Sequence, residues 1–271
     1  MPEGSLTVVG TGIRAGVQLT PEARDALVRA DEVLFLVAEP VAAAFLRRLN
    51  PVTRSLHHLY EPGVDRRHAY EAMVEEILGP VRTGREVCAA FYGHPGVFGA
   101  PAHEAVRRAR EEGHEARMLP GVSAEACLFA DLGLDPGVDG CQSYEATDFL
   151  VRPRRIDTKA VLVLWQVSVL GRADYTPEPD GSRLPVLAER LLRRYPARHE
   201  VILYEASPYP VGEPVVRRLR LVDLAAAELP RLATLVVPPL GPGRRDLRTM
   251  ARLGLPLRRP PRAPARPRPA R

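Results

Sequence analysis

Residues 86–101 read EVCAAFYGHPGVFGAP, and this stretch decides the fold. EVCAAF is an apolar run of the length of a buried strand, and two glycines and a proline then force the chain to bend. Tyr92 and His94 lie at that bend. Because a parallel strand in an open sheet carries its ligand-binding residues at its carboxyl end, the stretch predicts a buried strand that presents one wall of a binding site.

Segments typical of strands and helices alternate on both sides of this stretch. Thr20 can cap the first helix, and Pro21 suits its first turn. Apolar strands that alternate with amphipathic helices predict a parallel sheet covered on both faces. The expected strands are residues 5–9, 32–37, 86–93 and 114–121, and the expected helices are residues 21–30, 41–49, 69–84 and 101–113.

The second half of the chain has a different pattern. Its strand candidates are separated by long connections and by one clear helix; they are residues 160–165, 200–206 and 233–239. We therefore predict an α/β protein with a parallel sheet in the first domain and a mixed sheet in the second. The predicted domains are residues 1–119 and 120–243, followed by a basic tail at residues 244–271 that is rich in Pro and Arg and expected to be disordered.

Composition and charge exclude several classes of protein. Cys88, Cys127 and Cys141 form no Cys-x-x-Cys pair, and the histidines lack a carboxylate at ligand spacing, so neither a disulfide framework nor a metal site is predicted. The sequence shows no signal segment and no run of about 18 apolar residues, which predicts a cytoplasmic protein without a membrane segment. Of the net charge of +5, residues 244–271 carry +9, so the rest of the chain carries −4 and no nucleic-acid partner is predicted.

Two further loops follow predicted strands. The glycines of GTGIRAG, residues 10–16, resemble a dinucleotide fingerprint, but VQLT separates them from the next helix, whose N-terminus therefore does not meet a pyrophosphate in the usual way. For this loop two interpretations stay open, a tight turn and a contact with a ligand. Residues 120–126, PGVSAEA, follow another strand, and Ser123 is placed to cap a helix. Together with residues 92–98, this loop predicts the mouth of a cleft.

The motifs YGHPGVF, LPGVSAEACLFADLG, GCQSYEATDFL, LWQV and TLVVPP together resemble the tetrapyrrole-methylase superfamily of S-adenosylmethionine (SAM)-dependent methyltransferases. More narrowly they resemble its borosin branch, the peptide backbone α-N-methyltransferases. The resemblance covers residues 5–240 and implies a homodimer with SAM, or its product S-adenosylhomocysteine, bound in a cleft between two α/β domains. By their motifs, the residues implied to line the SAM site are Tyr92, His94, Val97, Phe98, Ser123, Ala124, Gln166, Tyr204, Ala206 and Thr234.

The same resemblance implies that Tyr60, Arg66 and Tyr70, in LYEPGVDRRHAY, are catalytic. Peptide nitrogen is a poor nucleophile, so its methylation needs a base for the N–H and donors for the carbonyl oxygen. Arg66 and Tyr70 are four residues apart, and a guanidinium beside a phenol would lower the phenol pKa from about 10. Without the resemblance, an exposed Arg–Tyr pair on an ordinary amphipathic helix stays an alternative. Glu145 and Asp148 could position substrate or cap a helix, and capping is the favoured interpretation.

We therefore expect a SAM-dependent methyltransferase that N-methylates backbone amides of a separate, ribosomally made precursor peptide. A separate precursor is expected because the tail has no run of small and branched apolar residues, and the chain ends before the clasp and substrate segments of the best-known borosins. Two alternatives remain: a tetrapyrrole or other small-molecule methylase of the same fold, and a non-catalytic peptide-binding module.

Overall fold

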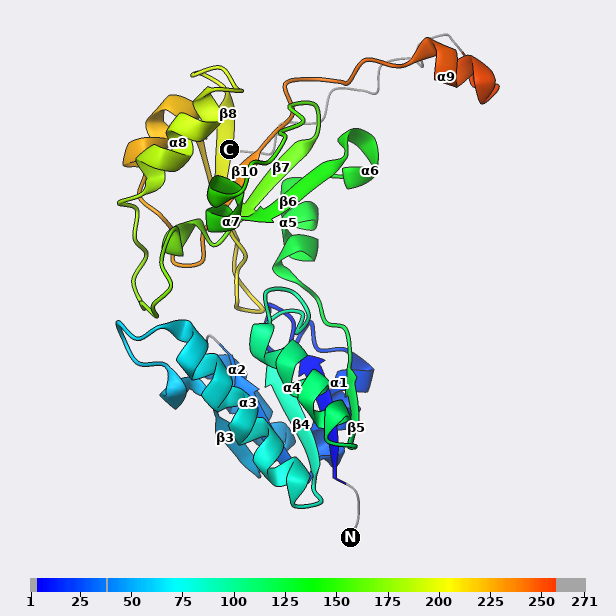
Figure 1. The fold of residues 1–271 in the computed structure, drawn as a ribbon, viewed down its shortest axis with the longest axis vertical. Coiled ribbons are helices and arrows are strands. Elements are labelled where there is room, and N and C mark those ends of the chain that lie inside the picture. The colour runs from blue at the N-terminus through cyan, green and yellow to red at the C-terminus, as the bar shows by residue number, and fades with distance from the viewer. Residues whose placement is uncertain (1–3, 38, 257–271) are drawn as a thin grey trace.

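The computed structural model describes residues 4–37 and 39–256, and it contains two sheets built from successive parts of the chain (Figure 1). The first sheet is five-stranded, all parallel, in the order β3-β2-β4-β1-β5. Its strands are β1 (Ser5–Gly10), β2 (Glu32–Leu36), β3 (Thr53–Ser55), β4 (Glu86–Phe91) and β5 (Glu115–Met118). Its helices are α1 (Pro21–Arg29), α2 (Pro40–Leu49), α3 (Arg66–Arg82) and α4 (Ala100–Glu111), with the short 3-10 helix η1 (His57–Leu59).

Helices cover both faces of this sheet, as predicted. On one face, α3 and α4 pack their buried side chains against inward residues of β1 and β4 such as Val8 and Ala89. On the other face, Leu27 of α1 and Leu46 of α2 pack against alternate residues of the same sheet. Because successive strand residues point to opposite faces, one strand serves both cores, which explains the almost wholly apolar sequence of β4.

The second sheet is also five-stranded, but it is mixed, in the order β6-β7-β10-β8-β9. Only β6 and β7 pair in parallel; the other neighbours are antiparallel. Its strands are β6 (Cys141–Glu145), β7 (Val161–Trp165), β8 (Glu200–Glu205), β9 (Val215–Arg220) and β10 (Thr234–Val237). The helical segments of this half are α5 (Ala124–Leu132), α6 (Pro136–Asp139), α7 (Ala146–Val151), η2 (Val167–Val169), α8 (Leu184–Leu192), η3 (Leu221–Ala226) and α9 (Leu247–Arg252).

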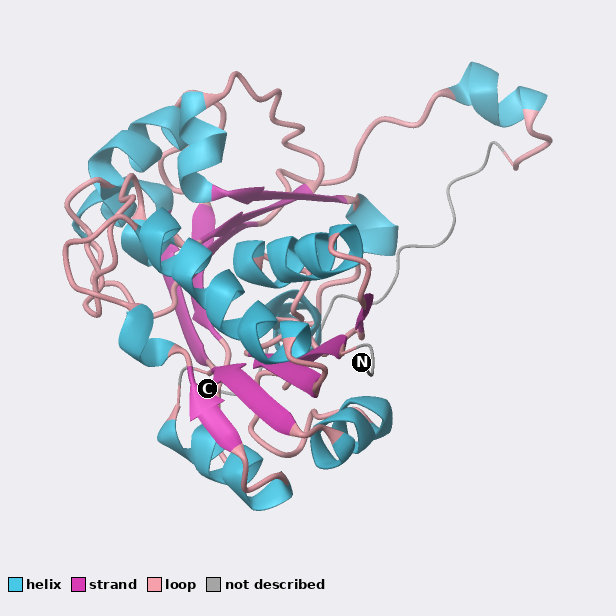
Figure 2. Ribbon diagram, turned by 60° about the horizontal axis from the view of Figure 1, so that its bottom comes forward, coloured by secondary structure: helices cyan, strands magenta, loops and turns pink. Residues whose placement is uncertain are grey.

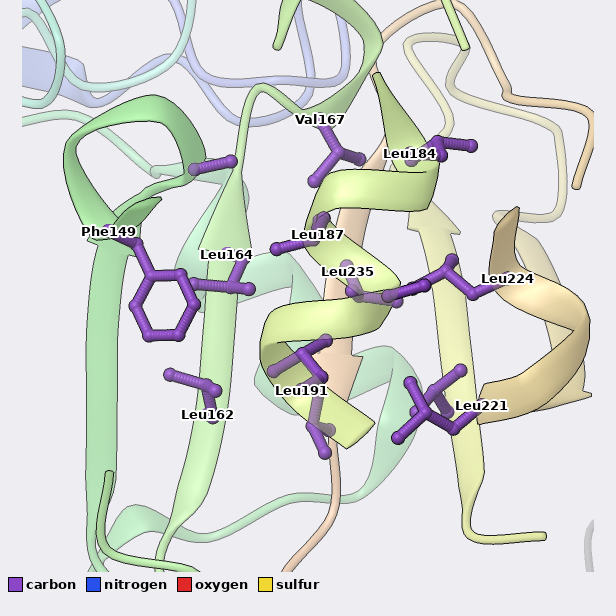
Figure 3. Packing of buried hydrophobic residues seen from close by; sticks show 14 of the residues in the cluster. Phe149, Leu162, Leu164, Val167, Leu184, Leu187, Leu191, Leu221, Leu224 and Leu235 are labelled. Carbon is purple, nitrogen blue, oxygen red and sulfur yellow. The ribbon is translucent and has the colours of Figure 1, made fainter. Parts of the chain in front are cut away.

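Leucines of α8 form the main core on the outer face of the second sheet. Figure 3 shows Leu187 and Leu191 pointing toward Leu164 of β7 and Leu235 of β10, with Leu224 of η3 at one side. The opposite face carries α5 and the strand residues that turn toward the first half of the chain. The two sheets lie in separate layers, each with its own helices (Figure 2). The α/β class and the parallel-plus-mixed sheet arrangement predicted from sequence are confirmed.

Several local predictions are confirmed by the caps. Thr20 accepts a hydrogen bond from the Ala23 amide at the start of α1, and Ser123 accepts one from the Ala126 amide at the start of α5. Glu145 caps α7 by accepting from the Asp148 amide, as interpreted. The same interpretation is wrong for Asp148, whose carboxylate lies inside α7 and pairs with Arg152 and Arg154.

Two differences from prediction concern the start of one helix and the tail. The helix expected from residue 69 begins at Arg66, because the Asp65 side chain caps it by accepting from the Arg67 amide. Within the tail expected to be disordered, Asp246 caps the six-residue helix α9, which extends away from the second sheet (Figure 1). Residues 257–271, which that prediction also covers, lie outside the described residues. No described helix is long and apolar enough to span a membrane.

Candidate functional site

Three glycines from three strand ends approach one another at the carboxyl edge of the first sheet. A Cβ on Gly10 would lie 2.3 Å from the Gly93 carbonyl oxygen and 3.0 Å from the Gly121 Cα. A Cβ on Gly121 would lie 2.7 Å from the same oxygen. The first glycine loop therefore serves close backbone packing after β1, and α1 begins only at Pro21, well beyond the glycines.

A cavity of about 410 Å³ opens at this edge and is lined by residues from both sheets. Its volume is in the range of small-molecule binding sites. The second sheet lines the cavity with the carboxyl ends of β7 and β8 and with the start of β10. The structure brings all the sequence-predicted site residues to its wall: Tyr60, Arg66, Tyr70, Tyr92, His94, Val97, Phe98, Ser123, Ala124, Gln166, Tyr204, Ala206 and Thr234.

Two residues on this wall have strained backbones. Phe98 has φ 54° and Gln166 has φ 60°, and these are the only non-glycine residues with positive φ in the described part of the chain. Each follows a strand by a short distance, and the Phe98 ring lies 6.1 Å from the ring of Trp165 at the end of β7. Such strain costs about 1–3 kcal/mol and clusters at functional sites. Because the rings of Phe98 and Trp165 lie this close, the GHPGVF bend and the end of β7 meet at the cavity wall.

The phenols of Tyr92 and Tyr204 are held neutral by their surroundings. Burial raises the pKa of both groups, and for Tyr92 the Glu205 carboxylate adds to the effect. The Tyr204 hydroxyl donates a 2.7 Å hydrogen bond to Asp131 of α5, which further raises its pKa. Asp131 was not identified from sequence, since nothing in the AEACLFADL helix marks it as a partner of a strand residue.

The acceptor-side candidates lie together at the other end of the cavity. Tyr60 ends η1, and its ring lies 6.4 Å from the Tyr70 ring of α3, edge to face. Burial, and then the neighbouring Tyr70, raise the pKa of Tyr60, while the Arg66 guanidinium lowers it by less. The net effect on Tyr60 is a raised pKa, because burial disfavours the charged phenolate more strongly than Arg66 favours it.

Arg66 is fixed by main-chain carbonyls of the second half of the chain. Its Nη2 donates to the Arg172 carbonyl at 2.8 Å, and its Nε donates to the Ala173 carbonyl at 3.4 Å. A second hollow of about 450 Å³ is also lined by Arg66 and Tyr70. The two hollows share five wall residues, which are Arg66, Tyr70, Phe98, Gly99 and Gln166.

Tyr175 is an aromatic residue of this wall that sequence reasoning missed. The Tyr175 ring stacks on the Tyr60 ring, with centroids 4.5 Å apart and planes 12° apart. His57 approaches both rings edge-on, at 5.8 and 6.2 Å. The stretch ADYTPEPDG that carries Tyr175 has no periodicity and matches no motif, so the sequence offered no signal.

The cavity wall carries more acidic than basic side chains. The carboxylates are Glu125, Asp174, Glu178 and Glu205, and the permanent cations are Arg66 and Arg231. Hydrogen bonds from Arg172 keep the pKa of Asp174 below its usual value, so it is ionised at neutral pH. The site is therefore better suited to a neutral or cationic ligand than to a polyanion.

The family model described as Tetrapyrrole (Corrin/Porphyrin) Methylases matches residues 5–220. The chain belongs to this family. The predicted enzyme class, a methyltransferase, is thereby confirmed. The fold agrees as well: a uroporphyrin-III-C-methyltransferase from Thermus thermophilus superposes with a TM-score of 0.63 at 25% identity, over 87% of this chain and 92% of that one.

Two relatives of the chain are named as both a methyltransferase and a ribosomally synthesized peptide precursor. It is 41% identical over 241 residues to the methyltransferase/ribosomally synthesized cyclic peptide gymnopeptides precursor of Gymnopus fusipes, covering 87% of this chain and 57% of the relative. It is 40% identical over 247 residues to the methyltransferase/ribosomally synthesized type I borosin cyclic peptide precursor of Coprinopsis marcescibilis, covering 88% and 63%. The chain thus spans less than two thirds of the length of these relatives.

Proposed function

We propose that this methylase uses SAM to N-methylate backbone amides of a separate, ribosomally made precursor peptide. The observation that carries the proposal is the position of Arg66 and Tyr70, which line both hollows. An internal backbone amide belongs to a chain that continues in two directions, so its site needs two exits. The naming of the relatives as peptide precursors supports the same substrate class.

The residues on the strand-end side of the cavity suit SAM. The cofactor is a sulfonium cation with an adenine ring, and when bound it supplies an electrophilic methyl group. The apolar and aromatic side chains Val97, Phe98 and Trp165 offer surfaces for the ring, and aromatic faces attract cations. The Tyr92 and Tyr204 phenols stay protonated at neutral pH, because a phenol pKa is ordinarily about 10 and theirs are raised further. The excess of carboxylates on the wall also favours a cationic ligand.

The acceptor side supplies what amide methylation needs. The nitrogen lone pair is delocalised into the carbonyl, so the nitrogen becomes nucleophilic as its proton leaves and charge collects on oxygen. Tyr60, whose pKa is raised, keeps its proton and is suited to donate to that oxygen. We assign removal of the N–H proton to Tyr70, one turn along α3 from the fixed cation of Arg66.

A tetrapyrrole substrate is less well supported by the same wall. Tetrapyrroles of the corrin and porphyrin type carry several carboxylates, whereas the cavity presents four carboxylates and two arginines. Like charges in a site of low dielectric constant disfavour binding. The charge of the wall therefore favours a neutral peptide backbone.

The test is co-expression with candidate precursor peptides and mass spectrometry of the product. The wild-type chain should add steps of about 14 Da, one methyl for one hydrogen, localised to backbone nitrogens by fragmentation. Tyr70→Phe removes the proton acceptor but keeps the ring, so methylation should fall by about 10²–10⁴ while SAM binding survives. The matched control is Tyr144→Phe, which removes a hydroxyl from β6 at a residue that does not line the cavity.

Each part of the proposal has its own contrary result. Methyl groups on side chains or on a tetrapyrrole would refute backbone methylation. Unchanged methylation in Tyr70→Phe would remove Tyr70 from the mechanism. Methylation found within residues of this same chain, and not on the co-expressed peptide, would refute a separate precursor.

A further inference from the structure

A short backbone ladder joins the acceptor-side loop to the second half of the chain. We call residues 172–176 the strap. The Gly63 amide donates to the Tyr175 carbonyl at 3.1 Å, and the Tyr175 amide donates to the Val64 carbonyl at 3.0 Å. The Arg66 amide donates to the Ala173 carbonyl at 3.0 Å. The strap therefore runs beside the loop that carries Tyr60 into α3, although more than 100 residues separate the two in sequence.

The strap is itself anchored in the second half of the chain. Arg172 pairs with Asp174 inside the strap and, at 3.2 Å, with Asp180 beyond it. Asp180 also pairs with Arg183 at 2.9 Å, and its amide donates to the Ser168 carbonyl at 2.7 Å. Ser168 is 3% exposed and lines the cavity. The position of the strap is thus set by the second half of the chain.

Two acceptor-side groups depend on the strap. The Tyr60 ring is stacked on the Tyr175 ring, and the Arg66 guanidinium donates to strap carbonyls. Tyr60 follows the end of η1, and of the rings of His57, Tyr70 and Tyr175 around it, that of Tyr175 is the one stacked on it. This stacked ring therefore restrains the Tyr60 ring. Positioning of this kind affects rate strongly, since a displacement of about 1 Å can cost about 100-fold.

We propose that Tyr175 is a positioning residue: its ring fixes the Tyr60 phenol against the acceptor amide, and the strap that carries it fixes the Arg66 guanidinium. This inference rests on the proposed function, because it assigns Tyr60 to the amide oxygen. It makes the acceptor site a product of both halves of the chain, with the reacting side chains in the first half and their restraint in the second.

The experiment compares Tyr175→Leu, which removes the aromatic ring, with Tyr175→Phe, which keeps it. In Tyr175→Leu, kcat on the precursor peptide should fall by about 10- to 100-fold, while the Kd for SAM stays unchanged. Tyr175→Phe should restore kcat to near the wild-type value. Tyr175→Met is the second ring-free variant, in case the leucine variant does not fold, and it should behave like Tyr175→Leu.

A second readout does not depend on methylation. The Tyr60 phenol can be titrated by NMR of tyrosine labelled at Cζ, with Tyr60→Phe to assign its signal. Burial raises the pKa of Tyr60; Tyr70, Arg66 and Tyr175 are the charged or titratable groups that contribute, and the His57 ring also faces it. Loss of the stacked ring exposes the phenol, so its pKa should move down toward about 10 in Tyr175→Leu and stay raised in Tyr175→Phe.

The outcomes separate this inference from the proposed function. If the wild-type chain methylates no peptide backbone, the proposed function fails, and the Tyr60 titration still decides whether Tyr175 fixes that ring. Wild-type kcat with an unchanged Tyr60 pKa in Tyr175→Leu overturns the inference. An equal loss in Tyr175→Phe overturns it too, because the hydroxyl and not the stacked ring would then matter. Loss of SAM binding in Tyr175→Leu would place the residue in the cofactor site instead.

Discussion

Gly10→Ala tests the close packing of the three strand ends. The added Cβ would lie 2.3 Å from the Gly93 carbonyl oxygen and 2.8 Å from the Pro95 Cδ. Ordinary contacts of a Cβ begin at 3.4 Å, so about 1 Å of overlap with main chain has to be relieved by separating β1 from the loop after β4. Neither the carbonyl nor the proline ring can rotate away, so the strain falls on the backbone.

The cost follows from this overlap. Overpacking of this kind destabilises a protein by about 1–3 kcal/mol. For a domain of about 150–250 residues each kcal/mol lowers Tm by about 2–4 °C, so we expect a decrease of about 2–12 °C. The displaced loop carries Tyr92 and His94, and each 1.4 kcal/mol lost there would weaken SAM binding about tenfold.

The measurements are thermal unfolding and isothermal titration with SAM. Gly181→Ala is the matched control, because its Cβ would meet nothing closer than 3.6 Å and its φ is not positive. That variant should be as stable as the wild type, or more stable by about 0.4–1 kcal/mol. A Gly10→Ala variant with wild-type Tm and wild-type SAM affinity would show that the strand ends are not packed as described.

Three further outcomes are expected. Burial raises the pKa values of Tyr60, Tyr92 and Tyr204, so the folded state keeps protons that the unfolded chain loses above about pH 10. The free energy of unfolding, measured with urea between pH 8 and 11, should therefore fall above about pH 10, and it should fall less steeply in Tyr204→Phe. A free energy of unfolding that stays constant over this range would contradict the prediction. The proposed homodimer should elute in size exclusion with light scattering at twice the 29.8 kDa chain mass, and a single-chain mass would exclude it. SAM or S-adenosylhomocysteine should bind in calorimetry and NAD should not, and the reverse pattern would count against the cofactor assignment.

Periodicity sufficed to predict the buried elements of the fold. The strands β1, β2, β4 and β5 and their helices have the apolar spacing of buried elements, and they were predicted to within a few residues. The strands β3, β6 and β9 were not predicted. β3 has three residues, and β9 reads VVRRLR with nearly every residue exposed, as suits a charged edge strand.

The site residues likewise divide into those that local sequence predicts and those that it does not. Residues directly after strands, such as Tyr92 and Gln166, are found from sequence because parallel and mixed sheets bring strand ends together. Tyr175 and Asp131 are not found, since each contacts its partner across more than 70 residues of chain. Such contacts come from the docking of whole elements, which local sequence does not encode. The left-handed backbone of Phe98 and of Gln166 had no local signal either.

The ladder between the strap and residues 63–66 uses only main-chain N–H and C=O groups. Such attachments are indifferent to side-chain identity, provided that no proline replaces a donor. Substitutions at cavity-facing positions such as Thr176 and Glu178 can therefore accumulate without detaching the strap. The shape and charge of this rim can therefore be changed while the main-chain attachment holds Tyr175 in place, which makes the acceptor wall open to redesign for other peptides.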